Sequence, residues 1–246
     1  MQVTLVAHYG RKAIGLATLL QRLQERLGEM LGGAFQPYDI EQVHATVVGL
    51  EGCRADGAIR GKRSGRAINL SGIVEFLRGD AFAPIQVRVG GYRAADRHSF
   101  RSRDEHPYLR SFSIQGSTAV AIGWPVEGAH PPDSLDRLRR SLERFGVRHK
   151  WHTAAEDVDN DCFLVLGRLD RDVIDHRILE AAAEAVRADL AATSHAMIDI
   201  DRDSLSFVGY LDSALPRATS RRYALNEPEL TRKLDALYPD CDEPGM

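Results

Sequence analysis

Val43-His-Ala-Thr-Val-Val-Gly-Leu50 is an extended, largely apolar stretch that contains two polar side chains, those of His44 and Thr46. Side chains of a strand alternate between its two faces, so His44 and Thr46 point the same way, and their valine and leucine neighbours favour burial. An imidazole that transfers a proton, beside a hydroxyl that orients an oxygen, suits a phosphate ester. The alternative is the edge of a strand with one ordinary polar face.

The composition is that of an ordinary globular protein. The chain has 246 residues, 43% of them hydrophobic, and its mean hydropathy is −0.29. This length allows one large domain or two closely packed lobes. No run approaches the ~18 apolar residues of a membrane span, and the N-terminal residues are typical of a first strand rather than a secretory signal. We therefore expect no membrane partner.

The net charge restricts the possible binding partners, and the cysteine content indicates the cellular compartment. The net charge of −3 excludes a protein that coats DNA, so any contact with nucleic acid must be local. Cys53, Cys162 and Cys241 are odd in number and widely spaced, which indicates no disulfide framework and favours a reducing compartment. We expect a cytoplasmic protein.

Hydrophobic periodicity predicts an α+β fold. It predicts helices over residues 14–31, 68–77, 134–145, 173–192 and 227–238. It predicts strands over residues 3–7, 42–50, 85–89, 112–114, 118–126, 162–169, 196–200 and 204–211. Because the helices are interspersed with hairpin-like pairs of strands, we expect antiparallel sheets.

Basic residues gather in predicted irregular segments. Residues 52–65 form a predicted loop rich in glycine, arginine and lysine, and residues 217–223 a basic turn. The first of these is either a solvated loop or a loop that faces a phosphate.

No motif predicts a cofactor or a metal. Gly10-Arg-Lys-Ala-Ile-Gly15 has the position of a phosphate loop, but Leu16 and Ala17 stand where such a loop needs lysine and a hydroxyl residue. Residues 149–161 contain two histidines and four carboxylates, which suit either a divalent metal or a charged solvent loop. The histidines lack helical spacing, so we expect no metal and no cofactor.

The chain resembles the 2H phosphoesterase superfamily, the group of RNA 2′,5′-ligase and cyclic phosphodiesterase relatives. The matching residues are His44-Ala-Thr46 and the closing segment from Met197 to Pro216, followed by Tyr223. The resemblance covers residues 1–225 and implies one bilobal, pseudo-symmetric domain. Two antiparallel sheets flanked by helices would surround a central groove, with a C-terminal helix and acidic tail over residues 226–246.

The resemblance also implies a second His-x-Thr motif on the strand over residues 162–169. Leu-Gly-Arg168-Leu matches the end of that motif, but Phe163 and Val165 stand where the histidine and threonine are expected. In the family, one histidine is the general base and the other the general acid on a 2′,3′-cyclic or 2′,5′ phosphoester, without metal. Losing one such group typically costs ~10²–10⁴-fold in rate.

Three functions stay open on this basis. The chain is an enzyme in which His44 and Thr46 act with another group, from His152 or His98. Alternatively, it binds a nucleotide or RNA end without cleavage, and Phe163 stacks on a base. In the third interpretation the groove is unused and the fold serves a protein partner.

Two further residues are predicted to bind the substrate. Arg168 follows a glycine of the family-like strand, and its alternative is a surface salt bridge. Tyr223 matches the family's closing segment. The expected ligand is a nucleotide or RNA phosphoester.

Overall fold

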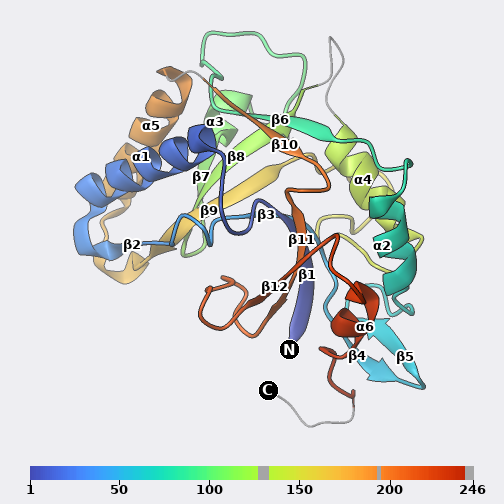
Figure 1. The fold of residues 1–246 in the computed structure, drawn as a ribbon. Coiled ribbons are helices and arrows are strands. Elements are labelled where there is room, and N and C mark those ends of the chain that lie inside the picture. The colour runs from blue at the N-terminus through green and yellow to red at the C-terminus, as the bar shows by residue number, and fades with distance from the viewer. Residues whose placement is uncertain (127–132, 193–194, 242–246) are drawn as a thin grey trace.

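Two antiparallel sheets with helices around them form the body of the protein, and this confirms the predicted α+β class (Figure 1). The structure is a computed structural model that describes residues 1–126, 133–192 and 195–241. The strands are β1 (Gln2–Ala7), β2 (Phe35–Pro37), β3 (Ala45–Gly49), β4 (Gly52–Ala55), β5 (Ala58–Gly61), β6 (Ile85–Val89), β7 (Phe112–Gln115), β8 (Thr118–Pro125), β9 (Cys162–Leu169), β10 (Ala196–Ile200), β11 (Leu205–Tyr210) and β12 (Arg221–Ala224). The helices are α1 (Ile14–Leu31), α2 (Leu70–Arg78), α3 (Pro107–Arg110), α4 (Ser134–Glu143), α5 (His176–Ala192) and α6 (Leu230–Asp235), with 3₁₀ turns at Gly32–Ala34 and Arg171–Val173.

The two sheets meet along β3 and β9. The first sheet has the strand order β12-β11-β1-β3, so β3 forms its edge. The second has the order β10-β6-β8-β9-β2, with β7 paired to β8. β3 and β9 contact each other across the junction, and α4 packs against β3. The two strands singled out in the sequence are thus neighbours in space.

One hydrophobic core serves both sheets. In α1, leucines recur at helical spacing, and Leu16, Leu20 and Leu27 are almost wholly buried. The same continuous core holds side chains from both sheets and from α2, α4, α5 and α6. α1 and α5 lie side by side on one flank, and α2 and α4 lie on the other (Figure 1). Among the described helices, none is long and apolar enough to cross a membrane.

Part of the predicted loop over residues 52–65 is a hairpin, so the loop prediction is wrong there. β4 and β5 pair in antiparallel register across Asp56 and Gly57. Both turn residues have positive φ, 51° and 74°, as a tight two-residue hairpin turn requires, and Asp-Gly is a preferred sequence for it. The basic turn over residues 217–223 likewise contains the start of β12, which pairs with β11.

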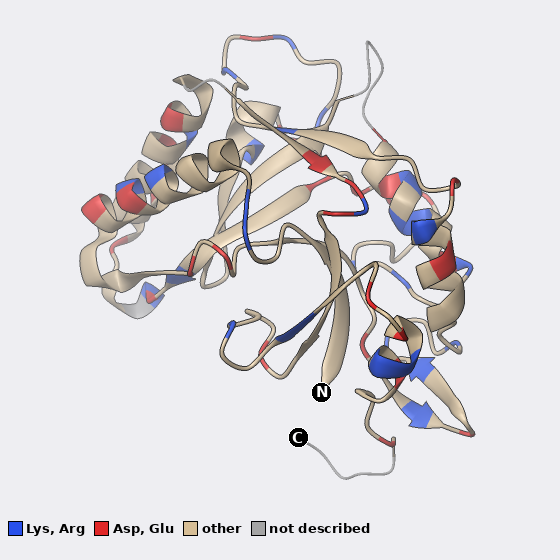
Figure 2. Ribbon diagram, in the orientation of Figure 1, with Lys and Arg blue, Asp and Glu red and all other residues tan. Residues whose placement is uncertain are grey.

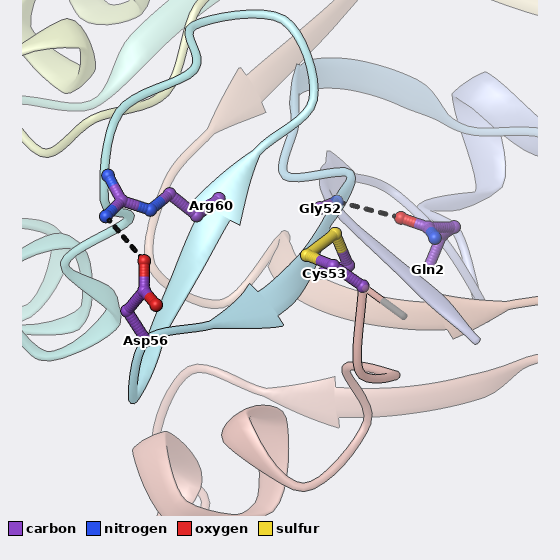
Figure 3. The surroundings of a disulfide bond; sticks show 6 residues. Gln2, Gly52, Cys53, Asp56 and Arg60 are labelled. Carbon is purple, nitrogen blue, oxygen red and sulfur yellow. Dashed lines mark hydrogen bonds and ion pairs between the residues drawn. A yellow bond between two sulfur atoms is a disulfide. The ribbon is translucent and has the colours of Figure 1, made fainter. Parts of the chain in front are cut away.

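A disulfide joins Cys53 of β4 to Cys241, so the expectation of no disulfide is wrong (Figure 3). The two cysteines are 188 residues apart, and their spacing gave no hint of the pair. The C-terminal segment returns beside β4. There the Arg54 amide donates to the backbone oxygen of Pro239, and the Cys241 amide donates to the backbone oxygen of Arg54. The cysteine argument for a reducing compartment therefore fails. Residues 242–246 of the predicted acidic tail lie outside the described residues.

Removing this disulfide is expected to lower the free energy of unfolding by about 2–5 kcal/mol, because the link closes a long loop and restricts the unfolded chain. Denaturant unfolding of Cys241→Ser against the oxidised wild type measures the effect. A reductant should lower the free energy of unfolding of the wild type to that of the variant. It should leave the free energy of unfolding of the variant unchanged. Equal stability of the oxidised wild type and the variant would contradict the prediction.

Candidate functional site

A cavity of about 250 Å³ opens where β3 and β9 meet. His44, immediately before β3, and Thr46 of β3 line it together with Phe163 and Val165 of β9. These are the four positions of the intact and the altered His-x-Thr motif. β3 and the segment after it also contribute Gly49, Glu51 and Arg63. The other lining residues come from distant parts of the chain: Thr4, Arg139, His149, Lys150, Tyr210, Ser213 and Leu215.

His44 is held as a neutral imidazole. Its Nδ1 lies 2.8 Å from the backbone oxygen of Gln42. Because a carbonyl oxygen only accepts, Nδ1 carries the proton and Nε2 keeps a lone pair. Burial lowers the pKa of His44 from 6.5 to about 4, against the opposing effect of the Gln42 bond and with a further contribution from Lys12. At neutral pH the ring is therefore able to accept a proton.

Thr46 presents a hydroxyl that is available to a ligand. The residue is half-buried, and among the described residues its hydroxyl has no hydrogen-bond partner. Its backbone oxygen accepts a hydrogen bond from Arg139, which holds this part of β3 in place. His44 and Thr46 therefore combine a proton acceptor with a hydrogen-bond donor on one wall of the cavity.

Arg139 of α4 ties β3 to the segment that leads into β9. The residue is 1% exposed, and its guanidinium donates to the backbone oxygens of Val47 and Thr46 on β3. The other donors meet the Asp159 carboxylate at 3.0 Å and the Asp161 backbone oxygen at 3.1 Å. Arg139 was not among the residues predicted from the sequence, although it lies four positions after Leu135 on the apolar stripe of the helix.

His149 lines the cavity with a ring that is bonded at one nitrogen and buried at the other. Its Nε2 lies 2.8 Å from the Asp159 carboxylate, and its Nδ1 is buried without a partner among the described residues. Burial lowers the pKa of His149 to about 4, although the bond to Asp159 favours the charged ring. The ring thus helps to hold the Asp159 carboxylate, which also forms an ion pair with Arg139.

Neither His152 nor His98 lines the cavity, although the ring of His152 packs against that of His149 with 5.2 Å between centroids. Both ring nitrogens of His152 lie 2.9 Å from carboxylates, those of Asp136 and Glu143, and its side chain is fully buried. His98 packs against Tyr92, with 5.3 Å between ring centroids. Within the described ranges, no group of three or more His, Cys, Asp or Glu side chains has an arrangement that holds a metal.

Arg168 and Tyr223, the predicted substrate-binding residues, do not line the cavity either. Arg168 is exposed and pairs with Asp212 at 3.2 Å, so it makes the surface salt bridge that was its alternative. Tyr223 is buried in the core, where it lies opposite Phe207 of β11. The closing segment instead contributes Tyr210, whose hydroxyl donates to the Glu51 carboxylate at 3.0 Å.

A basic groove of about 850 Å³ adjoins the cavity. It shares Glu51, Arg63, His149, Lys150 and Tyr210 with the cavity, and it adds Lys62, Arg148 and the buried His152. Glu51 is the one carboxylate among the described residues that line the groove. Basic residues also mark both strands of the neighbouring β4–β5 hairpin (Figure 2). The end of the predicted basic loop, at Lys62 and Arg63, therefore faces a continuous, positively charged opening.

No family model and no curated protein matches the chain. Among solved structures, the protein TT0787 of Thermus thermophilus is similar at a TM-score of 0.44 and 11% sequence identity. The match covers 92% of this chain and 96% of that one. A similarity of this size assigns neither a family nor an activity to the protein.

Proposed function

We propose that the protein is a 2H phosphoesterase-like enzyme that acts on a nucleotide or RNA phosphoester, 2′,3′-cyclic or 2′,5′-linked. In this proposal the two sheets are the two pseudo-symmetric lobes, and the cavity at their junction is the central groove. The observation behind the proposal is that His44 and Thr46 share one cavity with Phe163 and Val165. Strands of two different sheets thus bring both motif positions to one place.

The chemistry of the lining suits a phosphoester anion. The neutral His44 ring accepts a proton from an attacking oxygen, and the Thr46 hydroxyl donates to a phosphoryl oxygen. Arg63 and Lys150 add positive charge to the same cavity. Phe163 offers an aromatic face on which a base can stack.

A second candidate function is binding of a nucleotide or RNA end without cleavage. The presence of Phe163 and Val165 in the cavity favours it, because neither side chain transfers a proton. The two functions differ in one observable. Both predict saturable binding of phosphoesters, and only the first predicts turnover.

A panel of 2′,3′-cyclic and 2′,5′-linked nucleotides, assayed for binding and for turnover, tests the proposal. In Thr46→Val, loss of a hydrogen bond to a charged phosphate is expected to weaken binding or turnover by about 10–100-fold. Thr219→Val is the matched control, because Thr219 is exposed and does not line the cavity. The proposal fails if no panel member binds, or if Thr46→Val and Thr219→Val behave alike.

The adjoining groove predicts a salt dependence that grows with ligand length. For single-stranded ligands, each neutralised phosphate contributes about −0.7 to the slope of log affinity against log salt concentration. Lys62→Ala and Arg148→Ala should each reduce that slope by about 0.7 for an oligonucleotide and leave it unchanged for a mononucleotide. Arg177→Ala, at an exposed position of α5, is the control. Unchanged slopes in both groove variants would show that the groove binds no phosphate.

A further inference from the structure

The proposed site holds a proton acceptor but no matching donor on β9. Cleavage of a phosphoester leaves an oxygen that needs a proton, and a general acid near that oxygen speeds the reaction. Phe163 and Val165 have no proton to give, and both nitrogens of His149 are buried or bonded. Another group that lines the cavity must supply the acid if the protein is an enzyme.

Lys150 is a cation beside the phenylalanine that stands at the altered motif position. It lines the cavity together with His44. Its Nζ lies 5.9 Å from the centroid of the Phe163 ring and 5.0 Å from that of Trp151. Among the described residues, this ammonium has no hydrogen-bond or ion-pair partner, whereas Lys233 pairs with Glu227.

The other cations of the cavity already have acceptors. Arg139 uses its donors on backbone oxygens and on Asp159. Arg63 lies 3.7 Å from the Glu51 carboxylate. Of the described lysine and arginine side chains in the lining, Lys150 is thus the one without a carboxylate or carbonyl acceptor.

The surroundings of Lys150 make its proton easier to release than that of an ordinary lysine. Lys150 is an exposed residue, but partial loss of hydration lowers its pKa from 10.5, while Asp159 raises it. The positive charges of three arginines lower the pKa of Lys150 further: Arg103, Arg63 and Arg139. A lower pKa brings an acid closer to the pH at which the protein would work.

We propose that Lys150 is the cationic partner of His44, which binds the phosphoester anion and donates a proton to the leaving oxygen. This rests on the proposed phosphoesterase function. For a 2′,3′-cyclic ester, the oxygen of water bonds to phosphorus as one ring P–O bond breaks. The electron pair of the broken bond stays on the departing oxygen. His44 Nε2 takes the proton of water, and Lys150 protonates the departing oxygen. Solvent then restores both groups.

Lys150→Met and Lys150→Arg test this assignment with 2′,3′-cyclic nucleotides. The methionine variant should raise KM and lower kcat by ~10²-fold or more, because it removes both the charge and the proton donor. The arginine variant should keep KM near that of the wild type while kcat stays low, because a guanidinium does not deprotonate in this range. Both should lose the alkaline limb of the pH–rate profile, which a merely structural residue would not affect.

Lys233→Met on α6 is the control for loss of a lysine that does not line the cavity. Wild-type kcat and an unchanged alkaline limb in Lys150→Met, with His44→Ala inactive, would overturn the role of Lys150 and leave the proposed function standing. Wild-type rates in both variants would overturn the proposed function as well. If the wild type binds but does not cleave, the proton transfer is overturned. Anion binding by Lys150 is then judged from the affinity for a nucleoside 2′-monophosphate, which should fall at least about 10-fold in Lys150→Met.

Discussion

Replacing His44 with alanine is expected to lower kcat/KM for a cyclic or 2′,5′-linked nucleotide by ~10²–10⁴-fold, because the proton acceptor of the reaction is lost. The ring is buried, its Nδ1 is fixed by Gln42, and its Nε2 keeps the lone pair. Steady-state kinetics on purified variants measures the change. His176→Ala is the control, because that side chain is 73% exposed on α5. Equal rates in wild type and His44→Ala would rule out a catalytic His44.

The same residue determines the acid limb of the pH–rate profile. Because burial lowers the pKa of His44 to about 4, the neutral ring persists well below pH 6.5. The protonated ring cannot accept a proton, so activity should be present above about pH 4 and lost as the pH falls through that value. An acid limb of kcat/KM near 6.5, the ordinary pKa of histidine, would mean that the base is a different, more exposed histidine.

Replacing Arg139 with methionine is expected to lower the free energy of unfolding by about 3–5 kcal/mol, the usual cost of removing one partner of a buried ion pair. Asp159, which is 3% exposed, would lose its closest arginine, and the backbone oxygens of β3 would lose their donor. Denaturant unfolding followed by circular dichroism gives the difference. The same variant should weaken phosphoester binding, because Arg139 positions the strand that holds Thr46.

Arg137→Met is the matched control, because Arg137 lies on the same helix but pairs with Asp133 at the surface. That ion pair is exposed, so its loss should cost less than about 1 kcal/mol. Adding Asp159→Asn to Arg139→Met should recover part of the lost stability, since it removes a buried carboxylate that would keep only His149 and the more distant Arg103 as partners. If Arg139→Met is as stable as Arg137→Met, the buried arginine does not link the two sheets.

Much of the fold follows from local patterns in the sequence. Leucines at helical spacing predict α1, and the apolar run before Leu169 predicts β9. The β4–β5 hairpin was missed because its strands are short and rich in glycine and arginine, although Asp56-Gly57 is a hairpin signal. β12 is similarly short and polar, so its pairing with β11 has little local signature.

The site was predictable only where its residues share a short motif. His44 and Thr46 lie two residues apart in one extended segment, and Phe163 was found through the motif that it interrupts. Lys150 and Tyr210 come to the same cavity from segments far apart in the chain. Spacing along a sequence holds no information about such contacts, and the Cys53–Cys241 disulfide was missed for the same reason.

The most direct test of the central claim is a titration of the protein, labelled with ¹⁵N in its histidines, with adenosine 2′-monophosphate. Nitrogen resonances of His44 are assigned by their absence from His44→Ala. We predict that the His44 Nε2 resonance shifts saturably, with the same Kd as calorimetry gives, while the His152 resonances stay in place because carboxylates hold both nitrogens. Saturable binding that leaves His44 unchanged would contradict a phosphoester in this cavity.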